Sequence, residues 1–226
     1  MKRFYKAATV ADGQVLLDAR PVKTPARQAL VLPTGALADA VAAEWNAQGE
    51  DILPRTMPLT GLSNAAIDRV APDKEAFARG LALFGESDLL CYRADGPATL
   101  VARQTAEWDP LLAWARRRYD VDFEVVTGII HRAQPEATVA RLSHAVAVRD
   151  AFELAALSPL VTISGSLVIA LALAEDAIDT ATAWAAATLD EAWQAEQWGE
   201  DAEATARLEA RRAEFEAGYR LLTLLR

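Results

Sequence analysis

The residues of this chain that could carry chemistry are its 32 acidic side chains, two histidines and one cysteine. Paired carboxylates can act as general acid and base, and clusters of His, Cys and carboxylates can hold a metal. His131 and His144 form neither an HExxH pattern nor a metal-spaced cluster with Cys91. The sequence therefore predicts no catalytic residues, no metal and no cofactor. A small-molecule hydrolase assembled from scattered carboxylates stays an alternative, because abundant acids do not define a catalytic pair.

Nucleophile and phosphate-binding motifs are also missing from the sequence. Ser164-Gly165-Ser166 lacks the second glycine of a GxSxG elbow, and its apolar surroundings favour a helix cap. Neither GxGxxG nor GxxxxGKS/T occurs. Cys91 is interpreted as a buried small hydrophobic side chain. A single cysteine excludes an internal disulfide framework and fits a reducing compartment.

The acidic charge is concentrated in one C-terminal segment. Residues 175–216 contain 12 acidic residues and 3 arginines, a balance that equals the net charge of the whole chain, −9. Such a field repels nucleic acid and anionic membrane surfaces. We therefore expect no nucleic-acid partner. The segment is either a solvated helix face or a surface for another protein.

Within this segment, residues 190–200 read DEAWQAEQWGE and combine two tryptophans with four acids. At about 100° per residue, Trp193 and Trp198 lie roughly 140° apart on a helix, so they need not have the same role. Trp193 is predicted to face the core, and Trp198 to cover the helix end or to face a partner. Glu191 and Glu196 flank the buried stripe instead of facing each other as a catalytic pair. The pattern indicates a core helix with an acidic shoulder where another protein can dock.

An uncharged stretch, residues 154–174, is about as long as a membrane-spanning helix. Pro159 and the Ser-Gly-Ser sequence interrupt it, and acids follow it instead of Lys or Arg. We predict two short buried helices joined at Ser-Gly-Ser, and no membrane insertion. The N-terminus, MKRFYKAATV, resembles neither a signal peptide nor a transit segment, so a cytoplasmic protein is expected.

The elements that position these residues divide the chain in two. Residues 4–32 are predicted to form short strands around turns, and residues 36–48 a helix that Gly closes. The proline-bearing segment 51–58 is a candidate extended linker, and the pattern beyond it is mostly helical. The predicted fold class is α+β, with a small N-terminal β-rich α+β domain (residues 1–58) and a larger, mostly helical domain (residues 59–226).

A loop in the N-terminal domain, LDARPVKTPAR at residues 17–27, carries four polar side chains around two prolines. They are Asp18, Arg20, Lys23 and Thr24. Such a rigid turn indicates either an internal ion-pair lock or a docking surface. The lock is favoured, because Asp18 and Arg20 point the same way if the chain is extended.

Several blocks, taken in order over nearly the whole chain, resemble one known family. The blocks are Arg3-Phe4-Tyr5-Lys6, LDARPVKTP (17–25), Leu37-Ala38 leading to Glu44-Trp45 and Gln48, Met57-Pro58-Leu59-Thr60, DLLCYR (88–93), Gln104 with WDPLL (108–112), SLVIALAL (166–173) and Gln197-Trp198-Gly199. Their order and spacing make the combination specific. The set resembles the assembly chaperones of the F-type ATP synthase that bind its alpha subunit, best known from mitochondria.

This resemblance implies a non-enzymatic function without nucleotide or metal. Members of the family hold the newly made alpha subunit and shield a surface that the beta subunit later covers. A bacterial cytoplasmic member is expected, because the chain shows no transit segment. A monomer is expected as well, because no self-complementary heptad seam is present. A general-purpose holdase remains a third possibility.

The resemblance also implies which residues contact the partner. In the family, a carboxylate in the helix that leads to the Trp-Gly motif is functionally sensitive. Glu191 is the best match in this sequence, followed by Glu196 and Glu203, and the sequence does not distinguish among them. Together with Trp198 as an aromatic anchor, these form the expected partner-binding set.

Overall fold

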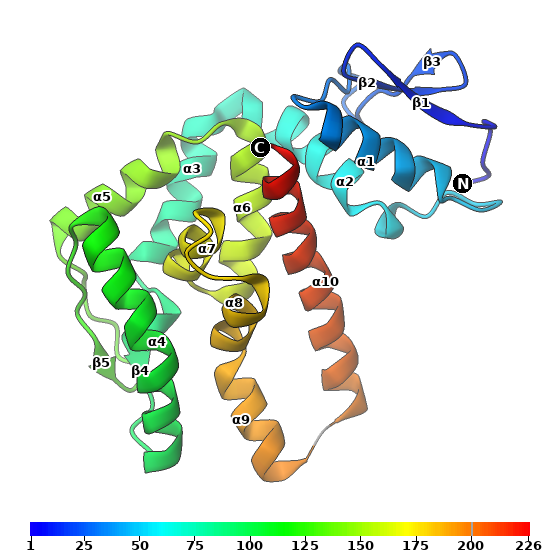
Figure 1. Cartoon of the computed structure of the whole chain (residues 1–226). Coiled ribbons are helices and arrows are strands. Elements are labelled where there is room, and N and C mark those ends of the chain that lie inside the picture. The colour runs from blue at the N-terminus through cyan, green and yellow to red at the C-terminus, as the bar shows by residue number, and fades with distance from the viewer. Residues whose placement is uncertain (200) are drawn as a thin grey trace. The chain divides into compact units, whose positions relative to one another are not determined.

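Helices and a few short strands make up the chain, which a computed structural model describes for residues 1–199 and 201–226 (Figure 1). Small sheets accompanied by many helices confirm the predicted α+β class. The described residues fall into two units. Unit 1 comprises Met1–Lys74, Asp150–Ala156 and Ala217–Arg226, and unit 2 comprises Glu75–Arg149 and Leu157–Glu216.

Unit 1 contains a three-stranded antiparallel sheet in the order β1-β2-β3. Its strands are β1 (Ala8–Ala11), β2 (Gln14–Leu17) and β3 (Arg20–Pro21). Asp12 and Gly13 turn the chain between β1 and β2 with φ angles of +51° and +71°. Two successive positive φ angles are typical of a type I′ turn, whose twist matches the flanking strands.

Helix α1 (Gly35–Asn46) packs against this sheet. Thr34 caps its start by accepting a hydrogen bond from the backbone N–H of Leu37 at 3.1 Å. Asn46 fixes its end, because its side-chain amide accepts from and donates to the backbone of Ala8 at 2.8 and 2.9 Å. Both ends of α1 are therefore held by side-chain hydrogen bonds.

The proline-bearing segment after α1, residues 51–58, contains the short 3₁₀ helix η1 (Pro54–Thr56). The buried side chain of Gln48 accepts a hydrogen bond from the backbone N–H of Leu53 at 2.8 Å. The segment predicted to be a linker is thus anchored to the end of α1. A boundary between independent domains at residue 58 stays a prediction.

Glu44 of α1 positions the next helix, α2 (Pro58–Ala65). Its carboxylate accepts hydrogen bonds from the backbone N–H groups of Leu59 and Thr60 at 2.7 and 2.8 Å. These N–H groups have no partner within the first helical turn, so an acceptor there stabilises the helix start. The π turn η2 (Ala66–Val70), the 3₁₀ turn η3 (Ala71–Asp73), and parts of α6 (Ala151–Ser164) and α10 (Ala202–Leu224) also belong to unit 1.

The polar loop at residues 17–27 is not held by the ion pair that we predicted between Asp18 and Arg20. Asp18 Oδ1 instead accepts hydrogen bonds from the backbone N–H groups of Ala7 and Lys6, at 3.1 and 3.0 Å. These bonds lower the pKa of the Asp18 carboxyl. Arg20 is exposed and forms no ion pair within the described residues. The predicted ion-pair lock is therefore wrong.

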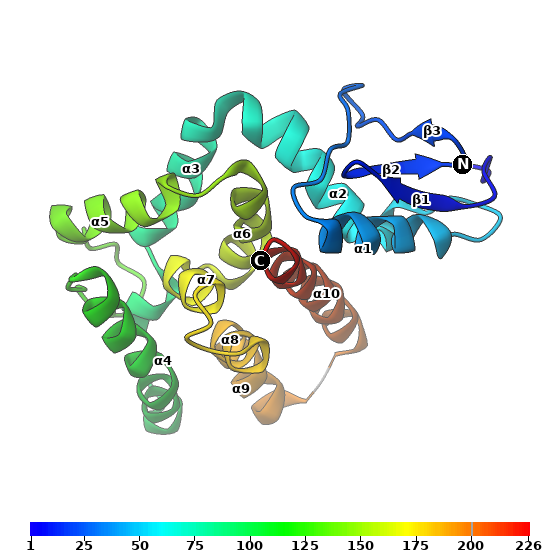
Figure 2. The ribbon, with the colours of Figure 1, turned by 45° about the horizontal axis from the view of Figure 1, so that its top comes forward.

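Helix α7 (Leu167–Ala174) forms the centre of unit 2, because all of its residues are buried. Helices α4 and α8 pack against it, and Figure 2 shows α8 beside α7. Strands β4 and β5 form a short parallel pair. Further elements of unit 2 are α3 (Lys74–Ala82), η4 (Leu83–Gly85), η5 (Leu89–Cys91), β4 (Tyr92–Arg93), α4 (Ala98–Tyr119), β5 (Val126–Thr127), α5 (Glu136–Ala147), α8 (Thr180–Ala187) and α9 (Leu189–Trp198).

The uncharged stretch at residues 154–174 forms α6 and α7, which confirms the two helices predicted there. They meet at Gly165, whose φ of +66° lies in the left-handed region that glycine adopts at least cost. Ser166 then caps α7 by accepting a hydrogen bond from its first turn at 3.0 Å. Over the described ranges, no helix is both long enough and apolar enough to cross a membrane.

Asp88 joins η5 to the start of α7. Its fully buried carboxylate accepts hydrogen bonds from the backbone N–H groups of Val168 and Leu90 at 2.9 and 3.0 Å. Burial raises the pKa of this carboxyl to about 6, although the hydrogen bonds act in the opposite direction. Burial also raises the pKa of the Cys91 thiol, to about 12. Cys91 is therefore the buried core side chain that the sequence predicted.

Candidate functional site

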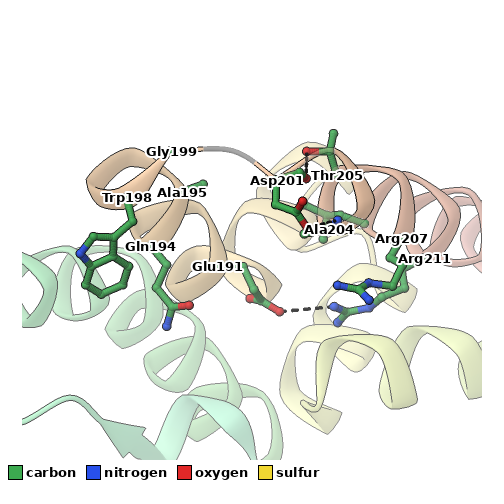
Figure 3. Close-up of a pocket in the computed structure, with 11 residues that line it drawn as sticks. Glu191, Gln194, Ala195, Trp198, Gly199, Asp201, Ala204, Thr205, Arg207 and Arg211 are labelled. Atoms are coloured by element: carbon green, nitrogen blue, oxygen red, sulfur yellow. Dashed lines mark hydrogen bonds and ion pairs between the residues drawn. The ribbon is translucent and has the colours of Figure 1, made fainter.

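A pocket of about 530 Å³ lies between α9 and the first half of α10, within unit 2 (Figure 3). It is lined by Glu191, Gln194, Ala195, Trp198, Gly199, Asp201, Ala204, Thr205, Arg207, Leu208 and Arg211. We call this site the α9–α10 groove. Its walls combine apolar and small side chains with charged groups, the composition of a surface that can receive a partner's side chains.

Small residues and helix ends create the groove. Helix α9 ends at Gly199, whose φ is +88°. Asp201 then caps α10, because its carboxylate accepts a hydrogen bond from the backbone N–H of Ala204 at 3.0 Å. Ala195, Gly199 and Ala204 line the walls and fill little volume between the helices. The groove therefore follows from local sequence at the junction of α9 and α10.

The other side of α9 is fixed to α4. Gln104 Nε2 donates a hydrogen bond to Asp190 Oδ1 at 2.8 Å. Trp108, which is completely buried, donates from Nε1 to the carbonyl of Ala186 at the end of α8, at 2.9 Å. These polar side chains are buried with their partners satisfied, which favours one arrangement of α4 and α9. Helix α9, which forms one wall of the groove, is thus fixed by its contacts with α4.

Glu196 belongs to this packed side of α9. Its two carboxylate oxygens accept hydrogen bonds from Nη1 of Arg103 in α4, at 2.8 and 3.0 Å. This pairing raises the pKa of the Arg103 guanidinium, and Glu107 contributes to the same shift. Glu196 does not line the groove. Its observed contacts are those of a connection between two helices.

Glu191 lies on another side of α9 and lines the groove. Its carboxylate lies 3.3 Å from Nη1 of Arg211 in α10, and Figure 3 shows this contact spanning the two helices. Arg211 also donates to the carbonyl of Ile163 in α6 at 3.0 Å. Because both partners are partly exposed, the pair contributes little to stability. It nevertheless leaves Glu191 with its charge partly neutralised.

Glu203 lies in the first turn of α10, where a carboxylate interacts favourably with the helix start. It accepts a hydrogen bond from Arg207, one turn later, at 3.1 Å. It is exposed and is not among the residues that line the groove. All three predicted carboxylates therefore have an arginine partner, and only Glu191 borders the groove.

Trp198 is the large apolar side chain of the groove. It is 75% exposed at the last turn of α9, and its ring packs edge-on against Trp193 at a centroid distance of 5.8 Å. Trp193 is only half-buried, so the prediction that it faces the core is wrong; Leu189 alone among the α9 residues is buried. Helix α9 packs against α4, and Leu189 is the residue that it buries.

Sequence reasoning missed the part of the groove that α10 supplies. Arg207, Leu208 and Arg211 line its second wall. From the sequence, these arginines were used only to calculate the net charge of residues 175–216. A helical turn separates Arg207 from Arg211, and this spacing is the signal that places them on one face.

The described residues hold no group of three or more His, Cys, Asp or Glu side chains that could bind a metal ion. The carboxyl whose pKa is raised to about 6, Asp88, caps α7 inside the core and does not line the groove. Glu191 in the groove forms an ion pair with Arg211 instead of a carboxylate pair. The groove therefore combines an ion pair with apolar and small side chains.

Comparisons with known proteins agree on one family. The ATP12 chaperone protein family matches residues 2–116. Over 219 residues the chain is 26% identical to the mitochondrial protein atp12 of Schizosaccharomyces pombe, a match that covers 88% of this chain and 74% of the relative.

Solved structures extend this likeness to the whole chain. The crystal structure of Atp12 from Paracoccus denitrificans has a TM-score of 0.94 at 43% identity and covers 100% of this chain and 98% of that one. The Atu1473 protein from Agrobacterium tumefaciens has a TM-score of 0.96 at 44% identity, covering 100% of this chain and 86% of that one. The similarity therefore includes the residues of both units.

Proposed function

Since the chain belongs to the ATP12 chaperone protein family and is thus a chaperone of ATP synthase assembly, we propose that its client is the unassembled alpha subunit of the F-type enzyme. In this proposal the chaperone shields the surface of the alpha subunit that the beta subunit later covers. An unassembled subunit exposes apolar surface meant for its neighbours and is prone to aggregate. Covering that surface until assembly is the task that the proposal assigns to this chain.

The α9–α10 groove is the proposed docking site, and exposed Trp198 is the observation that carries this assignment. A tryptophan that is 75% exposed beside a 530 Å³ groove can supply an aromatic anchor and receive apolar side chains of the client. Glu191 and Arg211 add polar specificity at the rim. Glu196 and Glu203 stay in the proposed set as flanking charges.

The proposal further holds that the chain works without catalysis or a cofactor, as a monomer in the bacterial cytoplasm. The solved structures that resemble it come from bacteria. Cys91 is buried and unpaired, which fits a reducing compartment. A chaperone that must release its client to the beta subunit also benefits from a modest interface, near or below about 1,600 Å².

The decisive test compares the two client subunits. Purified chaperone should suppress light scattering by isolated alpha subunit during refolding and leave aggregation of isolated beta subunit unchanged. Equal protection of both subunits would favour a general-purpose holdase. Failure to protect either subunit would refute the proposed function.

A matched pair of variants tests the docking site. Trp198→Ala should weaken binding of the alpha subunit by about tenfold or more, as expected for an aromatic anchor. Phe4→Ala is the control, because Phe4 is likewise exposed (65%) and packs edge-on against a neighbouring ring, that of Tyr5, at 5.5 Å. Binding by that variant should stay within about twofold of wild type, which is the range of near-neutral interface changes. Equal losses in both variants would remove the groove assignment.

A further inference from the structure

Unit 1 contains a loop with exposed cations on a rigid frame. The loop runs from Arg20 in β3 to Arg27, and we call it the basic turn. Its frame is Asp68 of η2, whose carboxylate accepts from the Thr24 hydroxyl at 2.6 Å and from the backbone N–H of Ala26 at 2.9 Å. Thr24 is buried, so these bonds hold the loop from inside.

The tip of the basic turn has an unusual backbone conformation. Arg27 has a φ of +64°, in the left-handed region that residues other than glycine rarely adopt. Its backbone N–H donates to the carbonyl of Thr24 at 2.8 Å. Strained positions of this kind persist where the surrounding structure holds them, and they cluster at functional sites. The turn therefore presents its side chains in a defined arrangement.

Three cations of the basic turn project into solvent: Arg20, Lys23 and Arg27 are all exposed. Within the part of the chain that the structure describes, their side chains form no ion pair and no hydrogen bond. Arg103 and Arg211 of unit 2 behave differently, since each binds a carboxylate. Basic side chains held on a rigid loop without internal partners are available for a negatively charged ligand.

We propose that the basic turn is a second contact surface of the chaperone and binds an acidic segment of the alpha subunit. This inference rests on the proposed function. A protein segment is the occupant that follows from the proposed function, and three separate cations match a few carboxylates better than they match the continuous charge of nucleic acid or an anionic membrane. Carboxylates spaced along a peptide match three cations spread over one loop.

The test uses the full-length chaperone and isolated alpha subunit in a surface-binding experiment. The variant Arg20→Gln/Lys23→Gln removes two charges from the basic turn. The control Lys6→Gln/Arg55→Gln removes two exposed charges elsewhere in unit 1, and those side chains likewise have no ion pair in the described residues. Arg27→Gly removes the third cation and leaves a residue that suits a φ of +64°.

Loss of steering charges should act mainly on association. The turn variant should associate with the alpha subunit about tenfold more slowly at low salt, with a smaller salt dependence and little change in the dissociation rate. Adding Arg27→Gly should slow association further, while the control should stay within about twofold of wild type. Thermal unfolding of each variant verifies that the fold is intact.

Each other outcome overturns the proposal in a distinct way. Unchanged association by the turn variant would show that the turn makes no contact, while the proposed function would stand if wild type and Trp198→Ala still differ. Equal slowing of association by the control variant would show that the net charge of the chaperone, and not the basic turn, sets the association rate. Binding of heparin or phosphatidylserine vesicles that depends on Arg20 and Lys23, with normal alpha-subunit binding, would assign the turn to another class of ligand. No binding of alpha subunit by wild type would refute the proposed function itself.

Discussion

Unit 2 holds carboxylates in two contrasting settings, the core at the start of α7 and the edge formed by α9 and α10. In the core, Asp88 is fully buried and bonded to backbone N–H groups. At the edge, Glu191, Glu196 and Glu203 are exposed and paired with arginines. A carboxylate therefore connects elements of the core in one region and forms surface ion pairs in the other.

The contrast shows that the number of acids in a segment does not locate function. The acidic excess of residues 175–216 is real, but its members include helix caps such as Asp179 and Asp201 as well as salt-bridged residues. Burial decides what each carboxylate contributes, because a charge removed from water depends on its partners far more than an exposed one. Removing individual carboxylates should therefore give effects that follow burial.

Replacing Asp88 should have the largest effect on stability. Asp88→Ala leaves the backbone N–H groups of Val168 and Leu90 buried without an acceptor and opens a cavity in the core. Each buried polar group without a partner costs about 1–3 kcal/mol, so we expect a loss of about 3 kcal/mol or more in the free energy of unfolding. Urea denaturation followed by circular dichroism measures this loss.

The exposed cap of α8 provides the control for Asp88. Asp179 accepts a hydrogen bond from the backbone N–H of Thr182 at 2.7 Å, and its bonds to Thr182 lower the pKa of its carboxyl. Asp179→Ala should cost clearly less than Asp88→Ala, because water can replace the lost acceptor. Equal losses would mean that burial does not separate the two kinds of carboxylate.

The second largest effect is expected in the pH dependence of the free energy of unfolding, through the titration of the Asp88 carboxyl. Its folded pKa, raised to about 6 by burial, lies above the value of about 3.9 expected for an unfolded aspartate. The stability that the protonated carboxyl contributes is therefore fully present below about pH 4 and is lost as the pH rises through about 6. The free energy of unfolding of wild type, measured relative to Asp88→Asn between these pH values, should fall as the pH rises. A rise over that range would show that the hydrogen bonds outweigh the burial.

Local signals explain which parts of the molecule the sequence could predict. Ser166 and Gly165 stand next to the helix that they help to start, so the junction of α6 and α7 was readable from neighbouring residues. The pair of Glu196 and Arg103 joins positions 93 residues apart. Such a contact depends on how α4 and α9 pack, and no short-range pattern encodes it. The same limit hid Arg211 and the second wall of the groove.

The Asp18 loop shows a different limit. Alternation along an extended chain led to an expected pair with Arg20, but backbone N–H groups of Ala7 and Lys6 compete for the same carboxylate. Aspartate bonds readily to nearby backbone groups, particularly in turns. Sequence spacing alone cannot rank a backbone donor against a guanidinium. Because Asp18 bonds to these backbone groups, Arg20 of the basic turn has no ion pair with it and is exposed.

Exchanging the charges of Glu191 and Arg211 tests the surface carboxylates, and we expect an effect on stability between those at Asp88 and Glu203. Glu191→Lys should lower the free energy of unfolding by less than about 1 kcal/mol, because its pair with Arg211 is partly exposed. The double variant Glu191→Arg/Arg211→Glu restores an ion pair across the groove with reversed polarity. It should recover the share of the stability that the ion pair contributes, measured by urea denaturation, but not the share of the bond from Arg211 to Ile163. Its binding of the alpha subunit should stay weaker than that of wild type, as we expect for Glu191→Lys in the groove. Recovery of both properties would make Glu191 a structural partner of Arg211 and remove it from the docking set.

The smallest effect is expected at Glu203. Glu203→Gln removes an exposed charge whose partner, Arg207, lies one turn away on the same helix. Pairs of this kind contribute about 0.3–0.5 kcal/mol, so the free energy of unfolding should change by no more than that. Binding of the alpha subunit, measured by the same surface experiment, should change less than with Glu191→Lys, because Glu203 does not line the groove. A larger loss of binding at Glu203 than at Glu191 would move the docking site from the groove to the exposed face at the start of α10.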